Sequence, residues 1–218
     1  TTTGLYFWEM GLYEPQPFDI DKSSNEFDGP KRPVIRTIYR TSDGRLWVGG
    51  KKVFGYIDSQ NEFHDQRHLF NAFAAQPTIS HIEEMSPGII WFGSYEKGLF
   101  EYNQQAESLV SLTSEWQLNC SSVFFIQKTP KSNLVGCADS LIRQDIQTGN
   151  IAMFNQLDGL ISDEMNEGAY FYSPKTGFYL GTPEGVMRLD VNRLVNRITD
   201  DHVMLESVSV YYNNTTEV

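Results

Sequence analysis

Apolar and polar residues alternate along this chain in short runs, and the runs recur every 43 to 45 residues. Each repeat contains an apolar run that closes on glycine: Leu46–Gly49, Ile90–Gly93, Leu134–Gly136 and Tyr179–Gly181. A polar turn and a second alternating run follow each of them. Alternation with a period of two is typical of strands, and a repeat in the forties made of short strands is typical of β-propeller blades. The pattern predicts an all-β fold of four-stranded antiparallel blades, in a partial or small propeller.

The first complete repeat illustrates the expected blade. Residues 34–40 alternate and predict the inner strand, 45–49 the second, 53–57 the third, and an outer strand lies near Phe63. Asp43-Gly44 between the first two strands is a strong hairpin signal, because glycine adopts the positive φ of tight turns without steric cost.

The same reading divides the whole chain. Complete blades are expected at about 34–75, 78–115 and 120–156, and a fourth blade at 168–191 that reaches its third strand, after a leading partial blade in residues 1–30. That leading segment opens on a third strand at Gly4–Trp8 and contains one more strand around Phe18. Residues 192–202 are expected to be a linker, and 203–218 the start of an immunoglobulin-like sandwich domain. Because most closed rings have more blades, we expect these blades to be the C-terminal piece of a longer propeller.

The amino-acid composition excludes some classes of binding partner but does not identify a function. The chain has 218 residues and a formal net charge of −11 at pH 7. An acidic surface repels phosphates, which makes nucleic acids and anionic membranes poor partners. No apolar run approaches the roughly 20 residues needed to cross a bilayer. No cofactor motif is present, so no cofactor is predicted.

The two cysteines, Cys120 and Cys137, fall in one predicted blade. Counting back from the hairpin near Lys131 places them several residues out of register. We therefore expect two free, buried thiols, with a disulfide bridge as the alternative.

The repeats resemble those of the two-component regulator propeller family. The motif of that family is written D-x-x-G-x-[LI]-W-[IVF]-G-T, followed by G-[LI]-x-x-[YF]-[DN]. Residues 42–49 with 55–58 are similar to it, and so are 90–94 with 98–103. The third copy departs from it, since Val135 replaces the tryptophan. Residues 158–169 are similar to the segment that opens the final blade in the family, and Val203–Tyr212 to the start of its tyrosine-rich immunoglobulin-like domain.

The resemblance implies a non-catalytic sensory part of a bacterial membrane receptor. It implies a periplasmic location, a histidine kinase or diguanylate cyclase output domain elsewhere in the receptor, and an extracellular ligand such as an oligosaccharide. The expected partners are therefore that ligand, the remaining propeller blades and sandwich domain of the receptor, and a second copy in a homodimer. The ligand, the total number of blades, the output domain and the oligomeric state are left open by the sequence.

Two other functions fit a propeller. A sialidase-like, glycan-cleaving enzyme would need two carboxylates flanking one bond, and Glu83, Glu84 and Glu167 are the available acids. The Asp-box of such enzymes is a poor match, because Asp43 directly precedes Gly44. A propeller that only binds other proteins is the second alternative.

Ligand-binding side chains are expected where inner strands begin and where the turns between second and third strands gather. We predict Arg36, His81, Tyr95, Asn166 and Glu167 as the binding residues. The same face is expected to display Asn119 at another strand start and Lys51, Glu96, Asp139 and Glu184 in the turns. Tyr95 and His81 would stack on a sugar ring, while Arg36, Asn166 and Glu167 would bind hydroxyls or a uronate. Each could instead simply solvate a loop face, and Asn166 and Glu167 could hold the final-blade turn through backbone bonds.

Two further features predict structure without chemistry. Trp47 and Trp91 occupy equivalent repeat positions and are expected in the core between sheets. The histidines His64, His68, His81 and His202 lack the spacing of metal ligands, so neither a metal site nor a catalytic residue is predicted.

Overall fold

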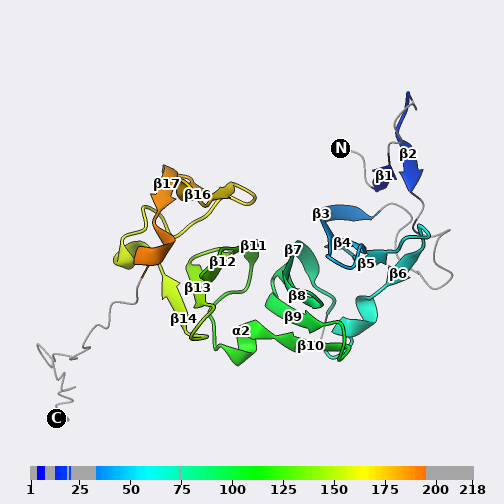
Figure 1. Cartoon of the computed structure of the whole chain (residues 1–218), viewed down its shortest axis with the longest axis horizontal. Coiled ribbons are helices and arrows are strands. Elements are labelled where there is room, and N and C mark those ends of the chain that lie inside the picture. Colours follow the sequence, from blue (N-terminus) through cyan, green and yellow to red (C-terminus); the bar gives the residue numbers. More distant parts are fainter. Residues whose placement is uncertain (1–3, 8–12, 19, 21–32, 74, 195–218) are drawn as a thin grey trace, which may run out of the picture.

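The structure is a computed structural model that describes residues 4–7, 13–18, 20, 33–73 and 75–194. The described chain is nearly all β, and its antiparallel sheets follow one another in sequence order along an arc (Figure 1). The predicted all-β class, with blade-like four-stranded sheets, is confirmed. The predicted sandwich start at 203–218 and residues 195–202 of the predicted linker lie outside the described residues.

Three of the sheets have four strands joined by hairpins. The first contains β3 (Val34–Arg40), β4 (Leu46–Lys51), β5 (Val53–Ile57) and β6 (Phe63–Asp65). The second contains β7 (Thr78–Ser86), β8 (Ile89–Tyr95), β9 (Gly98–Asn103) and β10 (Ser108–Ser111). The third contains β11 (Val123–Lys128), β12 (Ser132–Cys137), β13 (Leu141–Asp145) and β14 (Ile151–Phe154). We call them blades 1, 2 and 3; their inner strands β3, β7 and β11 lie on the inside of the arc.

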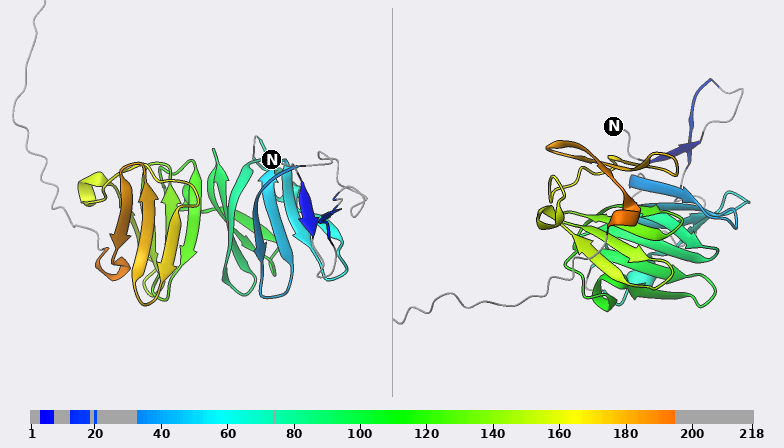
Figure 2. Two further views of the ribbon diagram at one scale, coloured as in Figure 1. Left: turned by 90° about the horizontal axis from the view of Figure 1, so that it is seen from above. Right: turned by 60° about the vertical axis from the view of Figure 1, so that its left-hand side comes forward.

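The sheets at the two ends of the arc are smaller. Before blade 1, β1 (Leu5–Phe7) pairs with β2 (Gln16–Phe18) in a two-stranded sheet. After blade 3, the sheet that we call blade 4 contains three strands, β15 (Tyr170–Ser173), β16 (Gly177–Thr182) and β17 (Gly185–Leu189). The left panel of Figure 2, seen from above, shows successive sheets of the array standing next to one another with their strands roughly aligned, and these two smaller sheets at opposite ends.

Short helices occupy some connections. They are η1 (Arg67–Phe70), α2 (Leu112–Glu115), η2 (Gln156–Asp158) and η3 (Val191–Arg193), the last of which starts the predicted linker. Within the described ranges, no helix is both long and apolar enough to cross a bilayer.

A hydrophobic core fills the space between each pair of successive sheets. Trp47, Phe54, Phe92 and Phe100 are buried between blades 1 and 2. Trp91 is buried between blades 2 and 3 with side chains that include Val123 and Val135. The predicted core positions of both tryptophans are confirmed. Blades 2 and 3 each bury one face against the sheet before and the other against the sheet after, so the core belongs to the stack rather than to any one blade.

The glycine that closes the repeated phrase allows the next blade to approach. A Cβ on Gly49 would lie 2.6 Å from Cγ2 of Ile79 on β7, and one on Gly93 would lie 2.5 Å from Cγ1 of Val123 on β11. Carbon atoms in contact normally stay about 3.5–4.0 Å apart. At Gly49 and Gly93 the residue is therefore glycine because the inner strand of the following blade fills the space that a side chain would need.

The expectation of two free thiols is wrong, because Cys120 and Cys137 form a disulfide with their Cα atoms 5.6 Å apart. Cys137 pairs with Val123 across β11 and β12, so a straight strand would carry Cys120 away from it. The segment before β11 bends instead: the Ser121 carbonyl accepts from Gly98 N–H, and the Ser122 carbonyl accepts from Ala138 N–H. The bend returns Cys120 to the end of β12. Counting residues along an ideal strand could not reveal it.

Candidate functional site

Tyr95 connects three parts of the arc on the face where the inner strands begin, which we call the strand-start face. It ends β8 and pairs with Thr78, the first residue of β7. Its hydroxyl donates a hydrogen bond to Oε1 of Glu167, in the segment before blade 4. The guanidinium carbon of Arg36, on β3, lies 5.7 Å from the centroid of its ring. Three of the predicted binding residues therefore meet at one phenol.

His81 lies farther along β7 and faces blade 4. Its Nε2 is 3.3 Å from the hydroxyl of Tyr170 on β15, and the two rings meet edge to face at 5.9 Å. Glu83 follows two residues later on the same strand, so it projects to the same side as His81. Its charge contributes to the raised pKa of Tyr170. Blades 2 and 4 thus face each other through His81, Glu83 and Tyr170.

Asn166 stands apart from these contacts. Its backbone N–H donates to the carbonyl of Gly181, 3.0 Å away, and its carbonyl accepts from Ala169 N–H at 3.1 Å. Its side chain is exposed. These bonds favour the alternative role, in which Asn166 holds the turn that leads into blade 4, and they place Glu167 next to a fixed point of the backbone.

The titratable groups of this face are held mostly in their neutral forms. Burial and the bond to Glu167 raise the pKa of Tyr95 to about 12, although Arg36 opposes the shift. Burial and the charge of Glu83 raise the pKa of Tyr170 to about 12. Burial also lowers the pKa of His81 to about 4, against a hydrogen bond with the Ile126 backbone. At neutral pH the face therefore offers two phenol hydroxyls and a neutral imidazole beside the Arg36 cation.

Glu83 is the acid of this region whose pKa is most displaced. Burial raises the pKa of Glu83 to about 7, and the negative charge of Glu84 adds to the effect while Lys128 opposes it. Glu83 therefore changes its charge near neutral pH, whereas an exposed glutamate does so near pH 4.

A groove adjoins the Tyr95 cluster on the strand-start face. It has a volume of about 330 Å³ and lies between the turn after β8 and the segment from β10 to β11. Glu96, Lys97, Asn119 and Phe73 line it together with four hydroxyl side chains and Cys120. The predicted face residues Glu96 and Asn119 thus belong to a real depression, lined by hydrogen-bonding groups and one aromatic ring.

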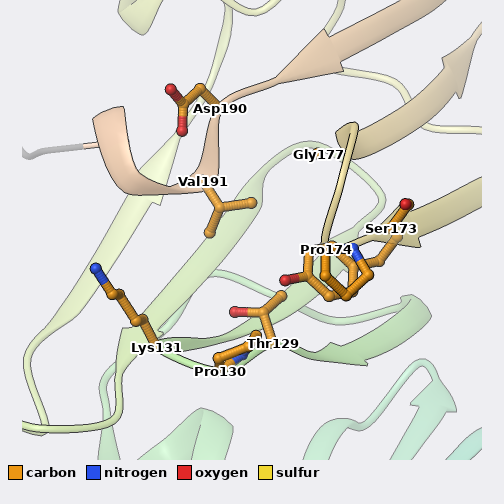
Figure 3. Close-up of a pocket in the computed structure, with 9 residues that line it drawn as sticks. Thr129, Pro130, Lys131, Ser173, Pro174, Gly177, Asp190 and Val191 are labelled. Carbon is orange, nitrogen blue, oxygen red and sulfur yellow. The ribbon is translucent and has the colours of Figure 1, made fainter.

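A second cavity opens on the opposite face, where first and second strands are joined, which we call the hairpin face (Figure 3). It measures about 230 Å³ and lies between the first hairpins of blades 3 and 4. Pro130 and Pro174 form its walls, and Lys131 and Asp190 stand at its rim. The sequence prediction placed no binding residue here.

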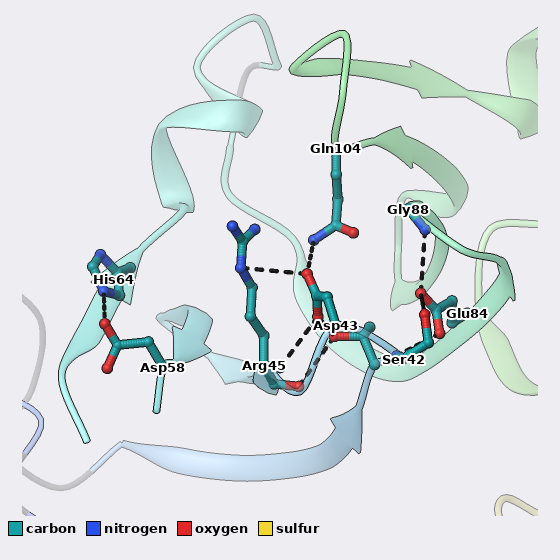
Figure 4. A network of polar contacts seen from close by, with 9 residues as sticks. Ser42, Asp43, Arg45, Asp58, His64, Glu84, Gly88 and Gln104 are labelled. Carbon is teal, nitrogen blue, oxygen red and sulfur yellow. Dashed lines mark hydrogen bonds and ion pairs between the residues drawn. The ribbon is translucent and has the colours of Figure 1, made fainter. Parts of the chain in front are cut away.

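The hairpin face also carries a polar network between blades 1 and 2 (Figure 4). Glu84 on β7 accepts from the Ser42 N–H at 2.7 Å, from the Ser42 hydroxyl at 2.9 Å and from Gly88 N–H at 3.2 Å. Asp43 accepts from the Gln104 side chain of blade 2 at 3.4 Å and pairs with Arg45. The aspartate turn of the repeat therefore links neighbouring blades.

These positions argue against the three glutamates as a glycosidase pair. Glu83 and Glu84 are neighbours on one strand and point to opposite sides. Glu84 pairs with Ile90, five residues from Tyr95 along β8, so about 16 Å of strand separate it from the contact with Glu167. A catalytic pair of carboxyl groups lies within about 10 Å.

Sequence reasoning missed Tyr170 and Lys128, and it named Glu83 only as an acid for the glycosidase alternative. A signal was available for Glu83, because it follows His81 by two residues on a predicted strand. Nothing local identifies Tyr170, which meets His81 only because blades 2 and 4 approach each other on the inside of the arc.

Hairpin-joined sheets stacked face to face around an inner row of strands define the class of β-propeller proteins. Within this class, residues 29–52 match the family model described as two component regulator propeller. The predicted resemblance to that family is confirmed by this match.

The similar proteins are described as a histidine kinase and as extracellular domains of one-component and two-component systems. Histidine kinase P4 of Formosa agariphila is 24% identical over 189 residues, which are 81% of this chain and 14% of the kinase. The extracellular domain of a protein described as a one-component system of B. thetaiotaomicron superposes with a TM-score of 0.66 at 17% identity, covering 85% of this chain and 24% of that one.

A further extracellular domain, from a hybrid two-component system of B. thetaiotaomicron, gives a TM-score of 0.52 at 17% identity. It covers 72% of this chain and 24% of that one. These likenesses establish the propeller fold. This chain spans well under half the length of each relative.

Proposed function

We propose that this chain is part of the extracytoplasmic sensor propeller of a two-component-type receptor, and that it binds its ligand on the strand-start face. The observation that carries the proposal is the meeting of Arg36, the Tyr95 hydroxyl and Glu167, which come from three separate parts of the arc. A ligand placed there contacts several blades at once and can therefore change how they sit together.

The disulfide supports the extracytoplasmic location independently. Disulfides persist in oxidising compartments such as the periplasm and are rare in the cytosol. The bridge between Cys120 and Cys137 closes a segment that lines the groove beside Tyr95. An oxidised bridge would hold that groove in shape where a receptor meets its ligand.

The chemistry of the face favours an oligosaccharide with an acidic group. Phenol hydroxyls, a neutral imidazole and an aromatic ring suit a polyhydroxylated ring, because they exchange hydrogen bonds and stack without demanding charge. Glu167 already places a carboxylate on the Tyr95 hydroxyl, beside Arg36. A uronate of the ligand would take the place of that carboxylate and release the segment that leads into blade 4.

Binding of acidic and neutral oligosaccharides to the full ectodomain, followed by thermal unfolding and calorimetry, tests the proposal. A ligand that binds only the folded state raises the melting temperature by mass action. Tyr95→Phe removes the hydroxyl and keeps the ring, and Arg36→Gln removes the cation. Each should weaken binding of an acidic oligosaccharide about 10-fold or more, the range expected when a hydrogen bond to a charged group is lost.

Lys131→Gln is the matched control, since Lys131 lies at the cavity of the hairpin face. It should leave the affinity unchanged. If Lys131→Gln weakens binding while Tyr95→Phe does not, the ligand occupies the other face. If no oligosaccharide shifts the melting temperature, the proposed ligand class is wrong.

A further inference from the structure

The outer hairpin of blade 1 brings together three side chains of the kinds that can bind a metal ion. Asp58 and Glu62 lie in the turn between β5 and β6, and His64 lies on β6. One ligand atom from each lies within 4.8 Å of the other two. His64 Nε2 is 2.8 Å from Oδ2 of Asp58, the contact drawn at the left of Figure 4.

The imidazole is oriented by its neighbours. His64 pairs directly with Tyr56 across the two strands, and its ring stacks on the phenol ring at 4.7 Å with an angle of 16° between the planes. The guanidinium carbon of Arg45 lies 4.4 Å from the centroid of the same phenol. The ring of His64 is therefore held by packing, with Nε2 directed towards the carboxylate of Asp58.

The carboxylate of Asp58 is held as well. Its Oδ1 accepts from the backbone N–H groups of Gln60 and Glu62, both at 2.9 Å, which leaves Oδ2 to face His64. These two bonds fix the orientation of the Asp58 carboxylate. The backbone N–H of Asp58 donates to the Glu62 carbonyl at 3.0 Å, which fixes where the third ligand starts.

We propose that Asp58, Glu62 and His64 bind a divalent transition-metal ion, with Zn²⁺ as the ion that fits best. An imidazole nitrogen with two carboxylates is a donor set that suits Zn²⁺, whereas Ca²⁺ and Mg²⁺ prefer oxygen ligands throughout. The ion would lie between Nε2 and Oδ2, with the single proton of the neutral imidazole on Nδ1. The side chains of His64 and Asp58 are 39% and 22% exposed, so water can complete the coordination shell.

Few other side chains of the types that bind Zn²⁺ are available elsewhere in the chain. The sequence contains two cysteines, and both are in the disulfide. Of the other histidines, His81 is half-buried against Tyr170 and His68 is exposed on η1. His202 lies outside the described residues.

Calorimetric titration of the chelator-treated protein with ZnCl₂, together with thermal unfolding, tests the inference. We expect one Zn²⁺ per chain and a melting temperature that rises with Zn²⁺ but not with Ca²⁺ or Mg²⁺ at the same concentration. His64→Gln and Glu62→Gln should each weaken binding about 10-fold or more, since even outer partners of metal ligands contribute that much. Glu62 is exposed, so its variant should keep the fold even if that of His64 does not.

His68→Gln and His202→Gln are the matched controls, and both should bind Zn²⁺ like the wild type. The inference is overturned if the folded wild-type protein takes up no Zn²⁺ at about 100 µM and its melting temperature does not rise. It is also overturned if Glu62→Gln and His64→Gln bind unchanged, or if a control variant abolishes binding.

Discussion

Blades 2 and 4 share the same repeat pattern in sequence, but they differ in how many of their faces pack against a neighbouring sheet. In blade 2 both faces pack against a neighbouring sheet, and Phe92 is fully buried. In blade 4 one face packs against blade 3 through Phe178 and Leu180. Two other apolar side chains of blade 4 are not covered: Phe171 on β15 is 61% exposed, and Val186 on β17 is 76% exposed.

The difference separates what forms a strand from what stabilises it. Alternation and turn residues are local, and they produce strands in both blades. Burial depends on the neighbouring sheet, and apolar surface contributes to stability only when it leaves water. In a stack of repeats, stability is roughly a sum of contacts between neighbours, so blade 4 should open at a lower free energy than blade 2.

Truncating one aromatic residue in each blade should give the largest contrast. Phe92→Ala removes a ring that packs against Trp47 and Phe54 and should lower the free energy of unfolding by about 3–5 kcal/mol. Phe171→Ala, at an exposed position, should change it by about 0.5 kcal/mol or less. Urea denaturation of the two variants measures both values. Equal losses would show that blade 4 buries this face in solution.

The disulfide should make the next largest difference. Replacing Cys120 and Cys137 together by serine opens a loop with a sequence separation of 17 residues. Closing a loop of this length stabilises a protein by about 3 kcal/mol through the entropy of the unfolded chain. Hydrogen exchange should then speed up first in blade 3 and in the segment before β11, which the bridge ties together. Exchange that speeds up in blade 4 alone would contradict this.

The polar link between blades 1 and 2 should contribute less. Glu84→Ala leaves the N–H groups of Ser42 and Gly88 without their acceptor and should cost about 1–2 kcal/mol. Glu184→Ala, in the exposed turn of blade 4, is the control and should be neutral within about 0.5 kcal/mol. Thermal unfolding compares the two. A neutral Glu84→Ala would mean that water replaces the carboxylate without loss.

The smallest expected effect is a dependence on pH at the contact between blades 2 and 4. Glu83 keeps its proton up to about pH 7 in the folded state and up to about its ordinary value of 4.5 when unfolded. The folded state thus holds more protons between these values, and the free energy of unfolding falls as pH rises from 4.5 to 7. His81 acts oppositely: its pKa falls from 6.5 to about 4, so its contribution is lost as pH falls through that window.

The two contributions oppose each other from pH 4.5 to 6.5, and single variants should separate them. Glu83→Gln should leave a protein whose stability rises with pH in this window. His81→Gln should leave one whose stability falls. Urea denaturation at a series of pH values measures both slopes. Parallel slopes in the two variants would show that neither group titrates as the burial of their side chains suggests.

The strands could be predicted from the sequence because their causes lie within a few residues. Gly44, with φ of +90°, makes the turn between β3 and β4, and the alternation from Val34 to Arg40 needs no knowledge of the rest of the chain. The burial of Trp47 followed from its place in the repeat. The same reasoning could not show that Phe171 is exposed, since that depends on what stands beside the sheet.

The candidate site was predictable in position but not in its contacts. Arg36, Tyr95 and Glu167 lie on the expected face because strand starts and turns follow from the hairpins. That Tyr95 contacts Glu167, 72 residues away, depends on the curvature of the arc. The disulfide was missed because a bend of three residues is invisible to a count along a strand. The contact of Asp58 with His64 spans a single hairpin, so its spacing of six residues could have revealed it.

The closing glycines also bear on how such an array can be lengthened. At Gly49 and Gly93 the neighbouring unit sits in room left by a missing methyl group, and it fills that room with one branched side chain, Ile79 or Val123. At each junction the glycine and the side chain that fills its space are separated by about 30 residues of the sequence, less than the length of one repeat. Inserting a whole repeat would therefore add both the glycine and the branched side chain that fills its space. Transplanting a single strand would leave a glycine whose space no side chain fills.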